Sequence, residues 1–459
     1  MTRTELPRVV VAGLSGDSGK SLVALGLARA LTKRGYRIAP FKKGPDFIDA
    51  AWIGAAAGEP GRNLDTFLMP TEAILASVAR SSLTADIAVV EGNRGLFDGL
   101  DAEGSHSTAQ LAKLIGAPAV LVVDVTKVTR TAAASVLGCQ AMDGALNLVG
   151  VILNRVGTNR QEAVIRQAIA SATGLPVLGA IPKLRDQLLP SRHLGLVTAV
   201  EHPDAVEALD RTAAAAKQYL DLDAIVDLAS GAPALPDVDL AESVEPMEPR
   251  ARIGVLSDRA FSFYYPENLA ALEAAGAEVC HISPLDDVEL PAIDGLYAGG
   301  GFPELHAAEL AANRSFREQL VERIDQGLPV WAECGGLMYL SRALIKDGNE
   351  HPMVGALPVS VEHTLRPQGH GYVRARVDHQ MPFLANGTEL RGHEFHYSRL
   401  HGTEDEIETV LALERGVGVG GGRDGLRVGS AVASYTHLHA LGVPEWADGL
   451  VGAAVGVAS

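Results

Sequence analysis

The feature that most constrains the fold is a glycine-rich loop between two apolar runs near the start of the chain. The segment RVVVAGLSGDSGKSLVALGLARAL, residues 8–31, is typical of a strand, a loop and a helix in that order. Glycines in such a loop let backbone N–H groups face phosphate oxygens, while Lys20 can reach the β- and γ-phosphates and Ser21 can ligate Mg²⁺. The spacing GxxxxxGKS is one residue longer than the usual GxxxxGK[ST]. We expect phosphate contacts from Gly13, Ser15, Gly16, Ser18, Gly19, Lys20 and Ser21.

The remaining sequence is organised in two α/β blocks. Up to about residue 229, strand-like runs such as DIAVVEGN and AVLVVDV alternate with helix-like runs, which predicts a parallel sheet covered by helices. The segment SGAPALPDVDLAESVEPMEPR has four prolines and no periodicity, so it is typical of a linker. We therefore predict an ATP-binding domain at 1–229, a linker at 230–250 and a second α/β domain at 251–459. The glycine-rich stretch 416–425 is interpreted as a flexible connection between strands.

Composition and charge narrow the class of protein. The formal net charge is -17, which disfavours binding to nucleic acid or to anionic membranes. No apolar run approaches the roughly 20 residues of a membrane span, and the N-terminus has no signal-peptide pattern. Three scattered cysteines do not suggest a disulfide framework. We expect a cytoplasmic protein whose partners are small molecules.

Charged residues follow several strand-like runs of the first block. In YRIAPFKKGPDFID, Lys42 and Lys43 come at the end of one run, and acids follow them. Because ligands of such sheets bind at the carboxyl ends of strands, the lysines are candidates to hold a substrate carboxylate. The candidate Mg²⁺ ligands are Ser21, Asp46, Asp49 and Glu91. Asn154 ends the run VGVILN, and we expect it near adenine.

The second block carries a candidate thiol site. In LPVWAECGGLMYLSRAL, Cys334 lies between a strand-like run and a run that predicts an amphipathic helix. Such an elbow exposes the side chain near a helix N-terminus, and we expect that position to lower the thiol pKa. His437, in SYTHLHALG, is the candidate base. The glycines expected to let a substrate approach closely and to stabilise an oxyanion are Gly299, Gly300, Gly301 and Gly335.

Both halves resemble known families. The loop GLSGDSGKS is similar to that of dethiobiotin-synthetase-like ATPases, and the second block resembles triad-type glutamine amidotransferases, whose histidine is followed by x-Glu. Here His439 occupies the Glu position, so the third member of the site stays open. Together the halves resemble the cobyrinate (hydrogenobyrinate) a,c-diamide synthases in FKKGPDFID, GRNLDTFLM, EGNRGLFDG, GLYAGGGFPELH, AECGGLMYL and RGHEFHYS. The related cobyric acid synthases have a PQNMALNS-like segment in place of KGPDFID.

The resemblance implies an ATP- and glutamine-dependent ligase of cobalamin biosynthesis. Cys334 would release ammonia from glutamine with His437 as proton shuttle. ATP·Mg²⁺ would phosphorylate the a and c carboxylates of cobyrinic or hydrogenobyrinic acid, and ammonia would displace the phosphate. Cationic candidates for this polyacidic substrate are Lys42, Lys43, Arg62 and Arg94. The resemblance is compatible with a homodimer.

Three alternatives remain at this stage. The first is the same diamidation of nickel-sirohydrochlorin, because the motifs do not specify the substrate's metal. The second is a regulatory ATPase of the ParA/MinD type, although Leu14, Ser15 and Gly16 stand where those proteins carry an extra lysine. The third is a scaffold with a vestigial amidotransferase half.

Overall fold

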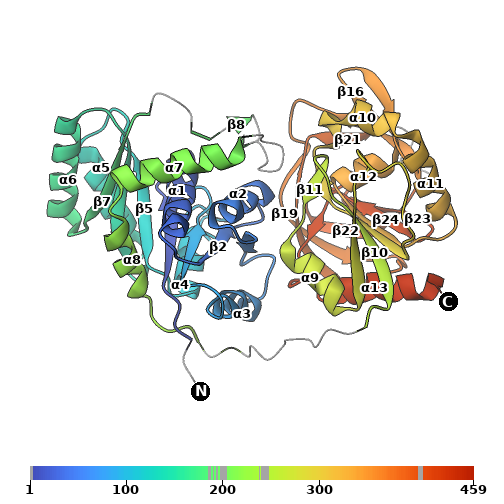
Figure 1. Ribbon diagram of the computed structural model, residues 1–459, viewed down its shortest axis with the longest axis horizontal. Helices are drawn as coiled ribbons and strands as arrows, with labels where there is room; N and C mark the ends of the chain where they lie inside the picture. Colours follow the sequence, from blue (N-terminus) through green and yellow to red (C-terminus); the bar gives the residue numbers. More distant parts are fainter. Residues whose placement is uncertain are drawn as a thin grey trace. The chain divides into compact units, whose positions relative to one another are not determined.

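The computed structural model describes residues 4–184, 188–189, 191–192, 195–196, 204–236, 238, 248–401 and 407–458. The chain divides into two compact units, Met1–Glu242 and Ser243–Ser459. The two are described separately below (Figure 1). Within the described residues, no helix combines the length and apolar character needed to cross a membrane.

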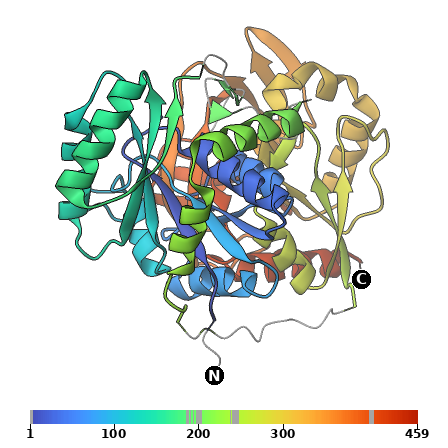
Figure 2. The same ribbon diagram turned by 60° about the vertical axis from the view of Figure 1, so that its left-hand side comes forward.

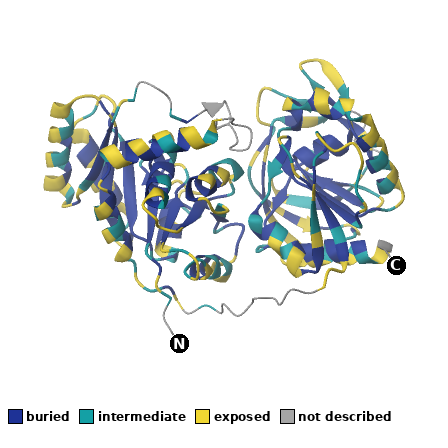
Figure 3. Ribbon diagram, in the orientation of Figure 1, coloured by how far each residue is buried: buried dark blue, intermediate teal, exposed yellow. Residues whose placement is uncertain are grey.

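The first unit is built on a seven-stranded sheet in the order β3-β2-β4-β1-β5-β6-β7, and every pairing in it is parallel. Its strands are β1 (Arg8–Gly13), β2 (Ile38–Lys43), β3 (Arg62–Leu64), β4 (Ile87–Glu91), β5 (Ala119–Asp124), β6 (Leu148–Val156) and β7 (Val177–Pro182), followed by the short pair β8 (Ser191–Arg192) and β9 (Gly195–Leu196). The central strands, such as β1 and β4, are fully buried because helices cover both faces of the sheet. Figure 3 shows these buried strands in dark blue. The predicted parallel sheet is confirmed.

Two layers of helices cover this sheet (Figures 1 and 2). The helices are α1 (Lys20–Lys33), α2 (Phe47–Ala57), α3 (Thr71–Ser81), α4 (Thr108–Leu114), α5 (Arg130–Met142), α6 (Asn159–Thr173), α7 (Ala205–Tyr219) and α8 (Leu222–Ser230). On one face, α1, α2, α7 and α8 share an apolar core with alternate strand residues such as Val9 and Val11. The intervening residues Val10 and Ala12 point to the opposite face and are equally buried.

The second unit has a ten-stranded mixed sheet in the order β12-β10-β13-β15-β24-β23-β22-β19-β20-β25. Its strands are β10 (Ala251–Leu256), β12 (Ala277–Ile282), β13 (Gly295–Ala298), β15 (Val330–Glu333), β19 (Gly369–Val377), β20 (Glu389–His396), β22 (Glu408–Arg415), β23 (Arg423–Val428), β24 (Ala431–Ser434) and β25 (His437–Leu438). The smaller sheets contain β11 (Phe261–Phe263) with β14 (Gly300–Gly301), and β16 (Ser341–Lys346), β17 (Asn349–Pro352), β18 (Leu357–His363) and β21 (Ser398–His401). The helices are α9 (Pro266–Ala274), the 3₁₀ turn η1 (Pro303–Leu305), α10 (Ala307–Ala312), α11 (Arg314–Asp325), α12 (Gly335–Leu340) and α13 (Glu445–Ala458).

One connection in this sheet positions the candidate base. β24 lies in the middle of the sheet beside β15, but β25, which begins after only two further residues, pairs with β20 and forms the edge of the sheet. His437 of β25 is therefore opposite His393 of β20. The carboxyl end of β15, which leads to Cys334, pairs with the end of β24 at Ser434. The fold thus brings residues 333–334, 393 and 437 into one region.

Three local predictions need correction or comment. The run LMYLSRAL is not one amphipathic helix, because α12 is fully buried and ends at Leu340, where β16 begins. At the start of the predicted linker, Leu235 is buried and its N–H donates to the Thr4 carbonyl, and Arg8 donates to the Pro233 carbonyl. The rest of that linker, residues 237 and 239–247, lies outside the described residues. Of the predicted connection 416–425, residues 416–422 join β22 to β23, and residues 423–425 belong to β23 itself.

Candidate functional site

The phosphate loop leads from β1 into α1 and is held by its own hydrogen bonds. Gly19 caps the helix with φ 96°, and a Cβ there would lie 2.1 Å from Asn154 Nδ2, so glycine is required. The Ser18 hydroxyl receives the Ser15 N–H at 3.0 Å and donates to the Ser15 carbonyl at 2.9 Å. The Lys20 ammonium folds back to the same carbonyl at 3.2 Å. These internal hydrogen bonds hold the loop in a curled conformation.

Gly16 and Asn154 are two further residues of the predicted nucleotide site. A Cβ on Gly16 would meet nothing within 4 Å, and the left-handed backbone falls instead on Asp17, with φ 56°. The Asn154 amide donates to the Ser18 carbonyl at 2.9 Å, and its oxygen accepts the Arg155 N–H at 2.9 Å. Asn154 thus fastens the loop to the end of β6. Gly13 lies under the Lys20 side chain, because a Cβ there would be 2.8 Å from Lys20 Cδ.

A buried charge cluster lies at the carboxyl ends of β2 and β4. The Lys42 ammonium donates to Asp49 Oδ2 at 2.6 Å, to Glu91 Oε1 at 3.1 Å and to the Gly92 carbonyl at 3.1 Å. The Ser21 hydroxyl donates to the same Glu91 oxygen at 2.7 Å. Burial lowers the pKa of Lys42, but Asp49 and Glu91 raise it by more, so the ammonium stays charged.

This cluster changes the prediction for Lys42. An ammonium has three donors, and all three are used inside the protein, with the side chain 2% exposed. Lys42 therefore balances the two acids instead of presenting its charge to a substrate carboxylate. Among the expected metal ligands, Ser21, Asp49 and Glu91 come together, whereas the Asp46 carboxylate caps α2 by accepting the Asp49 N–H at 2.7 Å.

The other cationic candidates lie on the same side of the first unit. Lys43 is buried beside Lys42, and this burial lowers the pKa of its ammonium. Asp65 opposes the decrease, whereas the charges of Lys42 and Arg94 add to it. Arg94 is exposed in the loop after β4 and has the left-handed φ of 47°. Arg62 opens β3, where it pairs with Phe41 of β2. Lys43 and Arg94 thus lie at the carboxyl ends of the adjacent strands β2 and β4, whereas Arg62 is at the beginning of β3.

In the second unit, Cys334 occupies a strained elbow between β15 and α12. Its φ of 47° and ψ of -94° are unusual for a residue with a side chain, and its N–H donates to the Ser434 carbonyl at 2.7 Å. Burial raises the pKa of the thiol, Glu304 adds to the rise and the Gly335 N–H opposes it. The expected low pKa is therefore wrong, because α12 is only six residues long and the elbow is buried. Such a thiol needs a base.

Three close approaches of glycine backbone assemble the groups around the elbow. A Cβ on Gly300 would lie 2.6 Å from His437 Cε1, and a Cβ on Gly335 would lie 3.0 Å from Gly301 N. A Cβ on Gly336 would be 2.1 Å from the Ala298 carbonyl. His437 and the elbow therefore pack against the same pair, Gly300–Gly301.

The expected oxyanion glycines are not equivalent. The Gly299 N–H donates to the Tyr264 hydroxyl at 2.7 Å, which in turn donates to the Leu256 carbonyl. That N–H is already used, so Gly300, Gly301 and Gly335 are the remaining candidates to stabilise an oxyanion.

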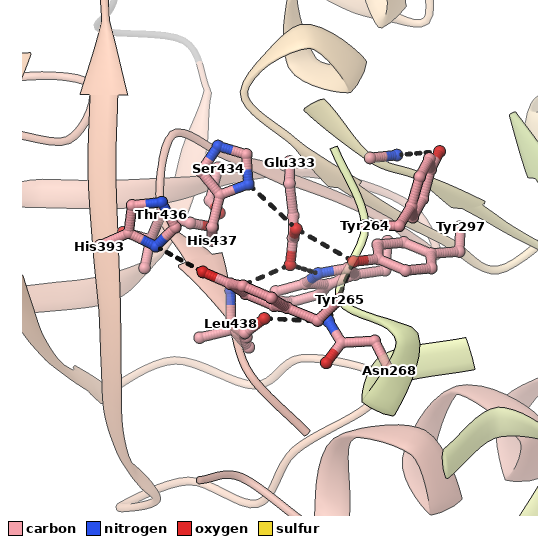
Figure 4. A network of polar contacts seen from close by, with 12 residues as sticks. Tyr264, Tyr265, Asn268, Tyr297, Glu333, His393, Ser434, Thr436, His437 and Leu438 are labelled. Carbon is pink, nitrogen blue, oxygen red and sulfur yellow. Dashed lines mark hydrogen bonds and ion pairs between the residues drawn. The ribbon is translucent and has the colours of Figure 1, made fainter. Parts of the chain in front are cut away.

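Sequence reasoning did not identify the carboxylate that contacts His437. Glu333 Oε2 lies 3.2 Å from His437 Nδ1, and both side chains are buried (Figure 4). His439, at the position where the resemblance expects an acid, lies 3.8 Å from Glu267. The sequence pattern that could have identified Glu333 is an ionisable residue at the end of the apolar run PVWA, directly before Cys334. The same pattern had drawn attention to Glu91.

These geometries define a class: a P-loop nucleotide-binding domain and a cysteine-dependent amidotransferase domain in one chain. Residues 9–196 match the family of CobQ/CobB/MinD/ParA nucleotide binding domains, and residues 252–444 match the CobB/CobQ-like glutamine amidotransferase domains.

Full-length relatives narrow this class. The cobyrinate a,c-diamide synthase of Magnetococcus marinus is 43% identical over 447 residues, covering 96% of each chain. Those of Archaeoglobus fulgidus and Dehalococcoides mccartyi are 41% and 40% identical, covering 95% and 94% of this chain and 95% of each relative. This chain belongs to the family of the cobyrinate a,c-diamide synthases.

Proposed function

We propose that this protein amidates the a and c carboxylates of cobyrinic or hydrogenobyrinic acid in cobalamin biosynthesis, with ATP and glutamine as co-substrates. The observation that carries the proposal is the presence of both sites, phosphate loop and Cys334 elbow, in a chain that matches cobyrinate a,c-diamide synthases over nearly its full length. A regulatory ATPase of the ParA/MinD type would have no use for the second site. The cytoplasm, where such small-molecule substrates occur, is the proposed location.

The amidotransferase unit would release ammonia. His437 takes the thiol proton, and Cys334 Sγ forms a bond to the side-chain carbonyl carbon of glutamine, whose oxygen becomes an oxyanion facing the glycine N–H groups. When the C–N bond breaks, His437 returns the proton and ammonia leaves. Water then cleaves the thioester to give glutamate and the free thiol.

The nucleotide-binding unit would activate the carboxylate. A carboxylate oxygen attacks the γ-phosphorus of ATP and ADP leaves. Ammonia then attacks the acyl phosphate, forming the amide and expelling phosphate with loss of one proton. The phosphate loop and Lys20 would hold the transferring phosphoryl group and stabilise its charge.

The chemistry of the charge cluster fits a magnesium ion. Glu91 Oε2 is buried and has no hydrogen-bond partner within the described part of the chain, so it has a lone pair directed at no donor. Ser21, Asp49 and Glu91 are the residues that would hold the ion, which would neutralise charge on the phosphates. No group of three or more His, Cys, Asp or Glu suited to a metal occurs among the described residues, so nucleotide and water would complete the coordination.

The polyacidic substrate needs local cations in a protein of net charge -17. Arg94 is the first candidate because it is exposed beside the cluster, and Lys43 and Arg62 are the next. We place Lys42 outside this set, because its ammonium already contacts Asp49 and Glu91.

The test is amidation of cobyrinic acid followed by mass spectrometry, with Cys334→Ala beside the wild type. The wild type should add two amides from glutamine, and the variant should add them only from free ammonia. If the wild type hydrolyses glutamine but leaves cobyrinic acid unchanged, the substrate is wrong, and nickel-sirohydrochlorin is the next to assay. If neither activity occurs, the protein is a scaffold.

A further inference from the structure

The contact between Glu333 and His437 raises the question of which imidazole nitrogen carries the proton. A base for the Cys334 thiol must have its proton on the nitrogen facing the carboxylate and a lone pair on the other nitrogen. A chain of obligatory donors and acceptors around Glu333 indicates where the hydrogens lie. The chain begins at α9, in the motif YYPENL.

Asn268 is the starting point, because its amide orientation is determined. The Ala440 N–H, which can only donate, lies 2.7 Å from Asn268 Oδ1, so this atom is the oxygen. The Asn268 NH₂ group then donates to the Leu438 carbonyl at 2.9 Å and to the Tyr297 hydroxyl oxygen at 3.1 Å. Because that hydroxyl oxygen accepts from Asn268, its own proton points elsewhere.

The Tyr297 proton points at Glu333. The hydroxyl donates to Glu333 Oε2 at 3.1 Å, and the Glu333 charge adds to the rise in the Tyr297 pKa that burial causes. Glu333 Oε1 accepts the Trp331 indole N–H at 2.9 Å and the Leu438 N–H at 3.1 Å, and neither group can accept a proton back. Both oxygens of Glu333 therefore act as acceptors, as in an ionised carboxylate (Figure 4).

We propose that Glu333 is the third member of the amidotransferase site, and that its carboxylate holds the proton of His437 on Nδ1. His437 Nδ1 donates to Glu333 Oε2 at 3.2 Å, which leaves Nε2 as the basic nitrogen that takes the thiol proton. Glu333 acts through His437 and is a positioning residue. The acid comes from the position directly before the nucleophile, not from residue 439.

The other groups around His437 do not replace Glu333. His393 stacks on His437 with ring centroids 4.9 Å apart, and burial lowers the pKa of His393 well below its usual value, with His437 contributing. His393 Nδ1 lies 3.3 Å from the Tyr265 hydroxyl. His393 therefore remains a neutral ring that restricts the tilt of His437. The competing acid, Glu267, is near His439 instead.

The test is Glu333→Gln in the full-length protein, with Glu267→Gln as the matched control. A glutamine side chain puts an NH₂ group among the donors, so His437 is driven to the opposite tautomer. We expect glutamine hydrolysis to fall by about 10²–10⁴-fold in Glu333→Gln. Glu267→Gln replaces a similarly buried acid beside the other histidine and should leave glutamine hydrolysis close to wild type.

The pH profile separates positioning from a merely structural role. Wild-type hydrolysis should level off once His437 has lost its proton, whereas the residual activity of Glu333→Gln should keep rising with pH as the thiol ionises unaided. Ammonia-dependent amidation in the same preparation shows that the first unit is intact. The proposal would be overturned if Glu333→Gln lowered glutamine hydrolysis without changing the shape of its pH profile. It would also be overturned if Glu267→Gln lost as much glutamine hydrolysis as Glu333→Gln.

This inference rests on the proposed glutamine chemistry but not on the corrinoid. Glutamine hydrolysis and labelling of Cys334 by a diazo-ketone analogue of glutamine need no second substrate. If the wild type reacts with the analogue and hydrolyses glutamine but fails to amidate cobyrinic acid, the proposed function fails while Glu333 can still be tested. If the wild type hydrolyses glutamine and Glu333→Gln does so equally well, only the role of Glu333 is refuted.

Discussion

The two candidate sites differ in how far the protein itself satisfies their buried acids. Glu333 in the second unit accepts hydrogen bonds from Trp331, Leu438 and Tyr297 besides contacting His437. In the first unit, Glu91 Oε1 accepts hydrogen bonds from Ser21 and Lys42. Glu91 Oε2 has no hydrogen-bond partner among the described residues. Both oxygens of Glu333 thus have protein partners, whereas Glu91 has protein partners on only one oxygen within the described residues.

This difference follows from what each site must do. A thiol site reacts faster when its dipoles are oriented in advance, because no reorganisation is then needed in the transition state. A phosphate site binds a charged nucleotide with its metal ion, so its acids must remain available. Burial raises the pKa of Glu91 to about 7, and a bound cation would favour its ionised form. Within the protein, Lys42 supplies the balancing charge.

The largest effect should come from removing that balancing charge. Lys42→Met leaves Asp49 and Glu91 without their buried cation, which typically costs about 3–5 kcal/mol. Hydrogen exchange of β2 and β4 measures the loss locally, because a chain of two units does not unfold in one step. Lys33→Met removes an exposed lysine that contacts Asp210 at 2.8 Å and serves as control. Unchanged protection in Lys42→Met would show that the cluster is not a charge balance.

Removing the phosphate-loop lysine should separate the two sites by function. Lys20→Met is expected to lower amidation by about 10²–10³-fold with either glutamine or ammonia, since a cation on the transferring phosphoryl group is lost. Hydrolysis of glutamine alone should be unaffected. Amidation and glutamine hydrolysis are measured on the same preparation. A variant that still amidates from ammonia at the wild-type rate would exclude Lys20 from the phosphate site.

A smaller effect is expected at the start of the donor chain. Asn268→Asp removes both donors to Leu438 and Tyr297, and the unpaired acceptors should cost about 1–3 kcal/mol of stability in the second unit. Glutamine hydrolysis should fall while ammonia-dependent amidation persists. Asn313→Asp is the matched control, because the Asn313 NH₂ group also donates twice, to the carbonyls of Pro284 and Asp287. Equal losses of hydrolysis in both variants would remove the special role of Asn268.

The smallest effect should be on substrate binding at the first unit. Arg94→Ala is expected to raise the corrinoid KM by about two- to fivefold, the scale of an exposed ion pair. The kcat should change little, and the effect should weaken with salt. Arg80, exposed near the end of α3, gives the control variant Arg80→Ala. A KM unchanged by Arg94→Ala would remove this residue from the substrate contacts.

The sequence predicted what local patterns encode. The alternation of apolar runs gave the parallel sheet of the first unit, and the loop GLSGDSGKS appears between β1 and α1 as expected. Strand ends correctly indicated that Ser21, Asp49 and Glu91 would meet, because parallel strands present their carboxyl ends at one edge. The elbow at Cys334 followed from a strand run directly before two glycines.

What the sequence did not predict depends on contacts between distant segments. Lys42 was expected to face a substrate because nothing local shows that Asp49 and Glu91 enclose it. The third member of the thiol site was left open because the step from β24 to β25, which brings His437 to Glu333, is a property of the sheet. The thiol pKa was expected in the wrong direction because burial, not helix position, dominates at Cys334.

The most direct test of the two-site account is the source of nitrogen in the product. The enzyme would be given cobyrinic acid, ATP, [amide-¹⁵N]glutamine and a low concentration of unlabelled ammonium, and the product amides would be weighed by mass spectrometry. The account predicts ¹⁵N in both amides for the wild type, unlabelled amides for Cys334→Ala and mostly unlabelled amides for Glu333→Gln. Unlabelled amides from the wild type, or ¹⁵N-labelled amides from Cys334→Ala, would contradict it.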